Sequence, residues 1–281
     1  VDAKTLSEHE NILFTKYDSG DMIGVKGEIM KTKKGQLSIK VPSSTILSKS
    51  LRTPPEKWHG VKDKETRFRQ RYLDFIVNPD AKKTLEIRSK VINIIRQFMH
   101  GEDFIEVETP TLQPKAGGAI AKPFITHHNA LDVDMYLRIA PELYLKRMIV
   151  GGFEKVFELG KVFRNEGIDQ THLQEFTMME SYEAFTNVNG VIEMVENMCS
   201  AVFEHLDLSH NISFDEKNGD FSFPWSKASM FDLVSKEVGV KVEFDSNFNE
   251  VLEELGRKGI EVDKEINTTG LLVYNLFERF V

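Results

Sequence analysis

Apolar residues recur at helical spacing in several stretches of the chain. Over residues 81–100 they line one face of a predicted helix, which Gly101 ends. The apolar residues of that face are Leu85, Val91, Ile92, Ile95, Phe98 and Met99. Further helices are predicted over 188–205 and 271–281, and Pro141 stands at the favoured first position of another, 142–150.

Strand-like segments alternate with these helices. Residues 22–30 and 36–41 predict two strands joined by a hairpin turn at 33–35, and a strand over 104–109 stops at Pro110, which has no N–H to donate. Other predicted strands cover 135–139, 175–182, and 153–163 as two segments around Gly160. The remaining chain predicts a short helix at 1–17, an irregular basic connector at 42–78, and a polar β-like insertion with short helices after Asn211.

Composition narrows the class of protein. The chain has 281 residues, 41% of them hydrophobic, which is enough for a sizeable core in one or two domains. A net charge of −8 argues against a nucleic-acid binder that works by bulk charge, although the basic run at 52–71 is either a solvated linker or a local RNA contact. The single cysteine, Cys199, excludes an internal disulfide. No apolar run approaches the roughly 18 residues of a membrane span and no signal-peptide pattern begins the chain, so a cytoplasmic protein is expected.

The candidate chemistry is concentrated in residues 163–182. Strand alternation puts Arg164 and Glu166 on one side, and it puts Phe176, Glu180 and Tyr182 together on the next strand. Phe176 and Glu180 would lie roughly 13 Å apart, which suits a stacked base at one end and an amino acid at the other. Arg164 offers a planar fork of donors for a phosphate. The pattern predicts a site for a nucleotide and a small cationic ligand; the simpler alternatives are a cross-strand charge pair and a core stripe.

Two other motifs were weighed. Paired glycines at 117–118 let a ligand approach the backbone closely. Adjacent His127 and His128 invite a metal interpretation, but neighbouring side chains diverge on an extended chain and no third ligand is suitably spaced. We therefore expect no metal site in this chain.

Several segments together resemble lysyl-tRNA synthetases, a family of class II aminoacyl-tRNA synthetases. The segments are 69–75 (RQRYLDF), 122–129 (KPFITHHN), 137–147 (LRIAPELYLKR) and 163–169 (FRNEGID), of which the last resembles the second class II signature motif. The resemblance implies an α+β fold, with a class II antiparallel sheet that is flanked by helices and preceded by a partial OB-type β-barrel. It implies three parts: residues 1–50 as the remnant of an OB-type anticodon-binding domain, 51–78 as a linker, and 79–281 as a catalytic domain that lacks its C-terminal part.

The resemblance also implies an activity and its residues. The reaction is the joining of L-lysine and ATP as lysyl-adenylate, followed by transfer to the lysine tRNA. Arg164 would be the catalytic group on the α-phosphate, and ATP would also contact Glu166, His172, the backbone near Leu173, and Phe176 under the adenine. Lysine would be held by Gly118, Glu142, Glu180 and Tyr182. The complete enzyme would use Mg²⁺ with ligands outside this chain. It would be a homodimer formed through the helix–strand–proline segment at 81–110, which resembles the first class II motif.

The chain departs from the family pattern in its motif-two loop and at its ends. His172-Leu173-Gln174-Glu175-Phe176 replaces the usual His-Asn-Pro-Glu-Phe, and it resembles aspartyl enzymes of the same subclass, although 164–167 and 180–182 favour lysine. The chain stops at Val281 before the third motif, so we expect a fragment at both ends that is inactive alone. Two alternatives stay open: a non-catalytic binding or dimerisation fragment, and an enzyme that attaches lysine to a protein.

Overall fold

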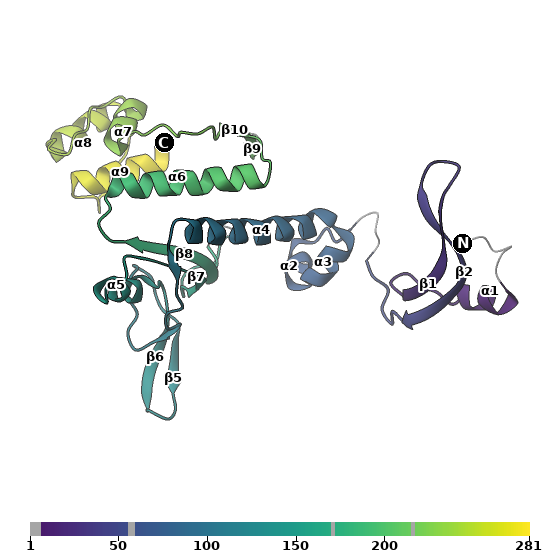
Figure 1. Cartoon of the computed structure of the whole chain (residues 1–281). Helices are drawn as coiled ribbons and strands as arrows, with labels where there is room; N and C mark the ends of the chain where they lie inside the picture. Colours follow the sequence, from purple (N-terminus) through teal and green to yellow (C-terminus); the bar gives the residue numbers. More distant parts are fainter. Residues whose placement is uncertain (1–6, 56–59, 170–171, 215–216) are drawn as a thin grey trace. The chain divides into compact units, whose positions relative to one another are not determined.

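The structure, a computed structural model, describes residues 7–55, 60–169, 172–214 and 217–281 (Figure 1). The chain divides into two compact units, Val1–Asn93 and Ile94–Val281. Residues 1–6 of the expected N-terminal helix lie outside the described part, and the helix that follows them is α1, Glu8–Phe14. The two units are treated separately below.

The first unit contains the predicted hairpin. Strands β1, Met22–Lys31, and β2, Leu37–Ser48, pair antiparallel, and Gly35 turns the chain between them with a φ of 80°. β2 extends beyond the predicted end at Val41 because a β-bulge lies where Gly27 opposes both Val41 and Pro42. A side chain at Gly27 would overlap the carbonyl oxygen of Lys40, so only glycine fits there. Bulges are where a strand tolerates a proline.

The interpretation of 42–78 as an irregular connector was wrong, because two short helices lie within it. They are α2, Lys64–Arg69, which Asp63 caps, and α3, Arg71–Val77. The buried carboxylate of Asp74 accepts hydrogen bonds from Arg67 at 2.8 Å, from Arg71 at 2.6 Å and from Asn78 at 2.5 Å. These charge-assisted bonds stabilise a segment in which the Phe68, Tyr72 and Ile76 side chains are largely exposed.

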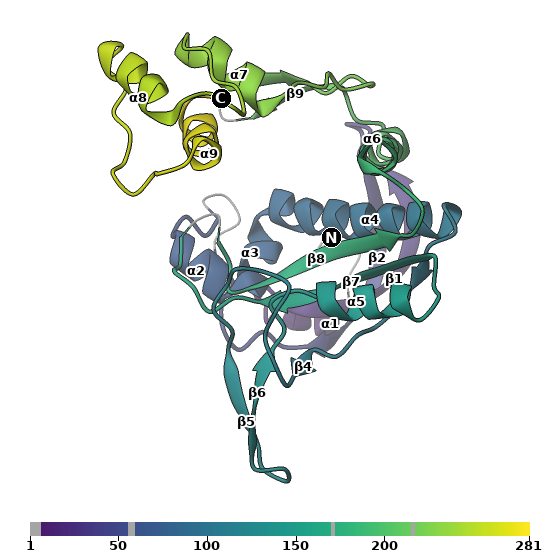
Figure 2. The ribbon, with the colours of Figure 1, turned by 90° about the vertical axis from the view of Figure 1, so that its left-hand side faces the viewer.

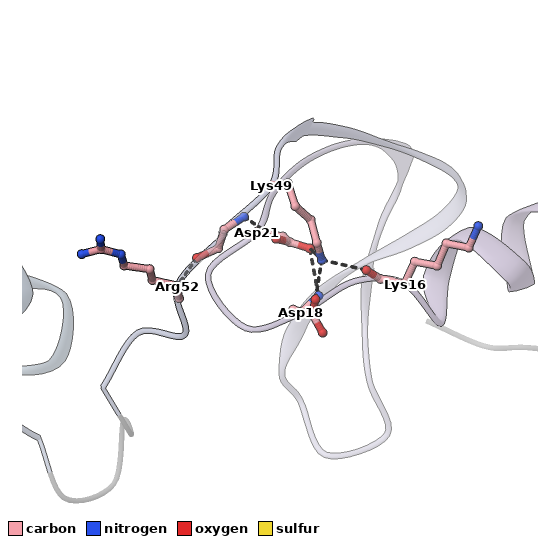
Figure 3. A network of polar contacts seen from close by, with 6 residues as sticks. Lys16, Asp18, Asp21, Lys49 and Arg52 are labelled. Atoms are coloured by element: carbon pink, nitrogen blue, oxygen red, sulfur yellow. Dashed lines mark hydrogen bonds and ion pairs between the residues drawn. The ribbon is translucent and has the colours of Figure 1, made fainter.

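A polar network fixes the chain on either side of the hairpin (Figure 3). Lys49 Nζ donates to Asp21 at 2.8 Å, to the Lys16 carbonyl at 2.9 Å, and to Asp18. Asp21 in turn accepts from the backbone N–H groups of Asp18 at 2.8 Å and Ser50 at 2.7 Å. The network therefore ties the segment before β1 to the residues that follow β2.

The stability of this unit is expected to depend on pH through Asp21. Hydrogen bonds from the Asp18 backbone, from Lys49 and from the Ser50 backbone lower the pKa of the Asp21 carboxyl from 3.8 to about 2. A pKa that is lower in the folded state means that the contribution is complete above pH 3.8 and is lost as the pH falls toward 2. The urea midpoint of Asp21→Asn, followed by circular dichroism, should lie below that of the unsubstituted chain at pH 6, and the two midpoints should converge near pH 2. Asp245→Asn, which removes an exposed carboxyl, is the control; a gap for Asp21→Asn that stayed constant down to pH 2 would contradict the prediction.

The second unit begins within helix α4, Pro79–Gly101, which confirms the predicted helix 81–100. Its main sheet has the order β3-β7-β8, with β3 parallel to β7 and β7 antiparallel to β8. A second sheet is antiparallel, in the order β4-β6-β5. The strands are β3 (Ile105–Glu106), β4 (Leu112–Gln113), β5 (Ile125–His128), β6 (Val133–Leu137), β7 (Lys155–Phe163) and β8 (Glu175–Glu183).

Several predicted boundaries change in this unit. The strand expected over 104–109 is reduced to β3, and the two segments expected around Gly160 form the single strand β7. Helices α5, Glu142–Val150, and α6, Val188–His205, have the predicted bounds. The α6 start is set by Asn187, whose side chain accepts hydrogen bonds from the N–H groups of Asn189 and Gly190. The mixture of helices and largely antiparallel sheets confirms an α+β chain.

The β7–β8 pair has two chemically different faces. Phe157, Leu159 and Met179, all at odd positions, pack into a core with Met99 and Phe104. Residues of α4 and α6 complete that core: Ile95, Phe98, Met194 and Met198. Helix α5 lies on the other side of the pair from α6 (Figures 1 and 2). The even positions of β7 and β8 therefore face away from this core and toward α5.

The C-terminal part of this unit forms the expected polar β-like insertion and short helices. The hairpin is β9, Asn211–Phe214, with β10, Lys217–Asp220. The helices α7 (Met230–Val238), α8 (Phe248–Arg257) and α9 (Thr269–Phe280) enclose a separate apolar core that includes Val234, Leu255, Leu272 and Leu276. Within the described residues, no helix combines the length and the apolar character that crossing a membrane requires.

Candidate functional site

Strand β8 carries three of the candidate residues on its α5-facing side. All three stand at even positions of the strand and are Phe176, Glu180 and Tyr182. Their respective partners across the ladder are Val162, Glu158 and Val156. Directly opposed residues of an antiparallel pair project to the same face. One face of two strands thus presents an aromatic ring at one end and a carboxylate with a phenol toward the other.

A cavity of about 290 Å³ opens at the Phe176 end. It is lined by Arg164, Glu166, Gly167, His172, Leu173, Gln174 and Phe176, which include all the residues expected at a nucleotide. The guanidinium carbon of Arg164 lies 5.2 Å from the centroid of the Phe176 ring, so the two planar groups form a cation–π pair. This cavity combines a flat apolar surface with a fixed positive charge.

Arg164 lines the cavity and has a buried donor without a partner among the described residues. Among the described residues, nothing accepts a hydrogen bond from its buried Nε. A buried donor left unpaired costs about 1–3 kcal/mol, and an acceptor on a ligand in the cavity would remove that cost. The backbone of Arg164 is fixed by its N–H, which donates to the Gln174 carbonyl at 2.9 Å.

The expectation that Arg164 and Glu166 share a strand face was wrong, because β7 ends at Phe163 and the following residues have no regular structure. The placement of Arg164 instead follows from its backbone bond to Gln174. His172 lies in the same loop, and its N–H and Nδ1 each contact the Asp169 carboxylate at 2.7 Å. Residues 170–171 of this loop lie outside the described part.

At the other end, the carboxylates of Glu142 and Glu180 approach the Tyr182 phenol. The Tyr182 hydroxyl donates to Glu180 Oε2 at 3.4 Å. Gly118 has a φ of 90°, and a Cβ there would lie 2.9 Å from the Glu142 Cβ, so a side chain would collide with the base of Glu142. Lys146 Nζ lies 2.5 Å from Glu142 Oε1 and 5.9 Å from the centroid of the Tyr182 ring. The Lys146 ammonium group is thus already paired with the Glu142 carboxylate at this end of the site face.

The electrostatics of this end favour a cationic ligand. Burial raises the pKa of the Glu180 carboxyl, and the neighbouring Glu142 carboxylate raises it further. Burial also raises the pKa of the Tyr182 phenol, with added effects from Glu180 and Glu142, so the phenol remains a hydrogen-bond donor. A positive charge between the two carboxylates would relieve their repulsion.

Comparison with known proteins decides the family. The family described as tRNA synthetases class II (D, K and N) matches residues 63–268. The chain belongs to the class II tRNA synthetases of this group. It is 49% identical to the lysine–tRNA ligase of Clostridium kluyveri over 95% of this chain and 54% of that protein.

Other relatives of this class II synthetase chain carry the same name. It is 49% identical to the lysine–tRNA ligase of Prochlorococcus marinus over 94% of this chain and 52% of that protein. It is 48% identical to that of Dehalococcoides mccartyi over 98% of this chain and 55% of that protein. The chain therefore spans about half the length of the curated relatives that it matches.

The class II synthetase site also rests on residues that the sequence did not single out. The ion pair of Arg138 and Glu158 is buried, with each residue only 4% exposed. Thr109 donates to Glu158 Oε2 from both its hydroxyl, at 2.6 Å, and its N–H, at 3.1 Å. Glu158 lies opposite Glu180 in the ladder. The one available signal was the charged Glu158 directly after the apolar Val156 and Phe157, since buried charges are rare unless paired.

Proposed function

We propose that this chain is the part of a lysine–tRNA ligase that binds ATP and L-lysine and joins them as lysyl-adenylate, for transfer to the lysine tRNA. The observation that carries the proposal is the single sheet face with an arginine–aromatic cavity at one end and two carboxylates with a phenol at the other. The shared name of the relatives supports lysine as the amino acid.

ATP takes the cavity end in this proposal. Phe176 stacks on the adenine, Glu166 faces the base, and His172 with the Leu173 backbone contacts the triphosphate. Arg164 directs its fork at the α-phosphate, where negative charge grows during attack. A guanidinium is suited to this task because its donors form a rigid planar set.

Lysine takes the carboxylate end. Glu142, Glu180 and Tyr182 pair its ammonium groups, and the Gly118 backbone lies against the ligand where no side chain intervenes. The lysine carboxylate attacks the α-phosphate, a C–O–P linkage forms, and the bond to pyrophosphate breaks. No general base is needed because the nucleophile is already ionised. The protein contributes alignment and charge stabilisation at phosphorus.

The larger assembly is also part of the proposal. Residues 1–50 belong to an OB-type anticodon-binding domain, 51–78 join it to the rest, and 79–281 belong to the catalytic domain. Ile29 and Leu37 of the hairpin are 75% and 70% exposed, which supports further strands that cover them. A homodimer forms through residues 81–110. ATP is used with Mg²⁺, but within the described ranges no three His, Cys, Asp or Glu side chains are grouped to hold a metal ion, so no step is derived from it.

Binding and turnover test the proposal separately. Calorimetry of the chain should show binding of ATP and L-lysine, with tighter binding of a non-hydrolysable lysyl-adenylate analogue than of either one. A chimaera in which this chain replaces the matching half of the Clostridium kluyveri lysine–tRNA ligase should catalyse lysine-dependent pyrophosphate exchange. Exchange stimulated by aspartate or asparagine instead of lysine would overturn the choice of substrate.

Phe176→Ala is expected to weaken ATP binding by about 1–3 kcal/mol, because a base loses its stacking platform. Lysine affinity should change little, because Phe176 lies at the other end of the site face from Tyr182. Calorimetry with each ligand measures the two effects. Phe153→Ala, which removes a ring outside both the cavity and the two strands, is the control. Equal weakening of ATP and lysine in Phe176→Ala would assign the ring to general packing.

A further inference from the structure

A buried charged pair lies directly beside the proposed lysine end of the site. Glu158 of β7 is the ladder partner of Glu180 of β8, so the two carboxylates project to the same face. Directly opposed side chains in an antiparallel pair start from Cβ atoms about 4.5–5.5 Å apart. Two like charges so placed repel each other unless a positive group intervenes.

Arg138 supplies that positive group. It follows β6, and its guanidinium pairs with Glu158 and lies over Gly160, where any Cβ would overlap it. Its Nε donates to the Lys161 carbonyl at 2.8 Å. Because Gly160 adds no side chain, the guanidinium reaches the site face of β7 from the segment that follows β6.

The pair is fixed by a complete set of bonds. Glu158 Oε1 accepts from Arg138, and Oε2 accepts from both donors of Thr109. Such a network joins the segment before Pro110, the end of β6 and the centre of β7. Replacing a buried ion pair by apolar groups is often neutral or stabilising, so stability alone does not account for it.

The charges around Glu180 come from several elements. The groups that face it are Glu142 of α5, Tyr182 of its own strand, Arg164 beyond β7, and Glu158 of β7. Lys146 of α5 reaches the same region through Glu142 and the Tyr182 ring. Glu158 is among the groups that raise the pKa of Glu180, and Arg138 holds the charge that offsets Glu158.

We propose that Arg138 is a positioning residue: by pairing with Glu158, it keeps the Glu158 charge from opposing the charge of Glu180 at the ligand ammonium. The proposal rests on the proposed function for its ligand, lysine. Arg138 contributes the compensating charge, and Glu158 holds the guanidinium against the β7 backbone with Thr109. Neither side chain touches the substrate.

The test is the titration of the Glu180 carboxyl in the chain itself. Carbon-13 NMR of the glutamate-labelled chain gives the midpoint, and the signal is assigned by its loss in Glu180→Gln. Glu158→Gln removes a negative neighbour and should lower the Glu180 midpoint by about half a pH unit or more. Arg138→Met leaves Glu158 uncompensated and should raise the midpoint by a similar amount. The double variant should return it close to the starting value.

The choice of variants and one further control separate this effect from general disruption. Arg138→Met leaves the buried Glu158 charge unpaired, so this variant can fail to fold. Glu158→Gln keeps the shape and hydrogen-bonding capacity of the side chain. If Arg138→Met does not fold, the direction of the Glu180 midpoint shift in Glu158→Gln is the test. Arg96→Met breaks the Arg96–Glu106 pair elsewhere in the same unit and should leave Glu180 unshifted. No shift in Glu158→Gln, or shifts of the same sign in Glu158→Gln and Arg138→Met, would overturn the proposal.

Lysine binding then distinguishes the two levels of inference. The pH at which lysine affinity falls by half should move with the Glu180 midpoint in each variant, while ATP affinity stays constant. Shifts of the expected signs in a chain that binds no lysine would overturn the proposed function but support control of the Glu180 charge by the pair. If the pH dependence of lysine affinity did not follow the Glu180 midpoint across the variants, the positioning role would be overturned.

Discussion

Arg164→Lys is expected to lower the rate of lysyl-adenylate formation by a factor of about 100 or more. Lysine keeps the positive charge but loses the planar fork, and the removal of one preorganised donor at a developing charge typically has an effect of this size. The cation–π contact at 5.2 Å with Phe176 and the buried Nε both depend on the guanidinium. Lysine-dependent pyrophosphate exchange in the chimaera measures the rate.

The effect should fall mainly on the rate, because the charge on the α-phosphate grows in the transition state. ATP affinity, measured by calorimetry, should therefore change much less than turnover. Arg257→Lys, an exposed arginine of α8 paired with Glu253, is the matched control and should keep full activity. Turnover of Arg164→Lys close to that of the unsubstituted chimaera would remove Arg164 from the catalytic role.

Glu180→Gln is expected to weaken lysine binding by about 2–3 kcal/mol. Removal of one partner of a fully buried ion pair costs about 3–5 kcal/mol, and Glu180 is only partly buried, so water reduces the effect. The amide can still bond the Tyr182 hydroxyl but cannot neutralise an ammonium. Calorimetric titration with lysine gives the loss, and titration with ATP should show little change.

Glu183→Gln provides the comparison for Glu180. Glu183 lies three residues further along the same strand, has the opposite parity, and pairs with Lys155 at 3.1 Å. Lysine affinity should be unaffected by this substitution. If the two variants lost lysine affinity equally, the carboxylate end of the site would not be the ammonium-binding end.

Local signals in the sequence predicted much of the fold. Helix α5 begins where Pro141 predicted, and α6 has the bounds predicted from its apolar spacing. The hairpin turn at Gly35 was also correct, because a positive φ favours glycine. By contrast, the predicted second strand stopped at Val41, before Pro42, whereas β2 continues to Ser48. The bulge that accommodates this proline depends on Gly27 of the opposite strand.

Features that depend on distant residues were not predictable in this way. The buried Asp74 and its arginine partners join α2 to α3, and no local pattern in the charged segment indicates this contact, so the segment was expected to be irregular. The pairing of Arg138 with Glu158 joins residues 20 positions apart, and no local pattern specifies it. The candidate site residues were easier to select from the sequence because most of them lie in one short stretch that ends in β8.

The alternation along β8 has a consequence for how this strand can vary. Met179 belongs to the core, whereas its neighbour Glu180 belongs to the site face. On the proposed function, a substitution at Met179 therefore acts on unfolding and one at Glu180 acts on recognition, although the two residues are adjacent in sequence. We expect that amino-acid preference can be redesigned at Glu180 and Tyr182 while the melting behaviour of the protein stays nearly constant.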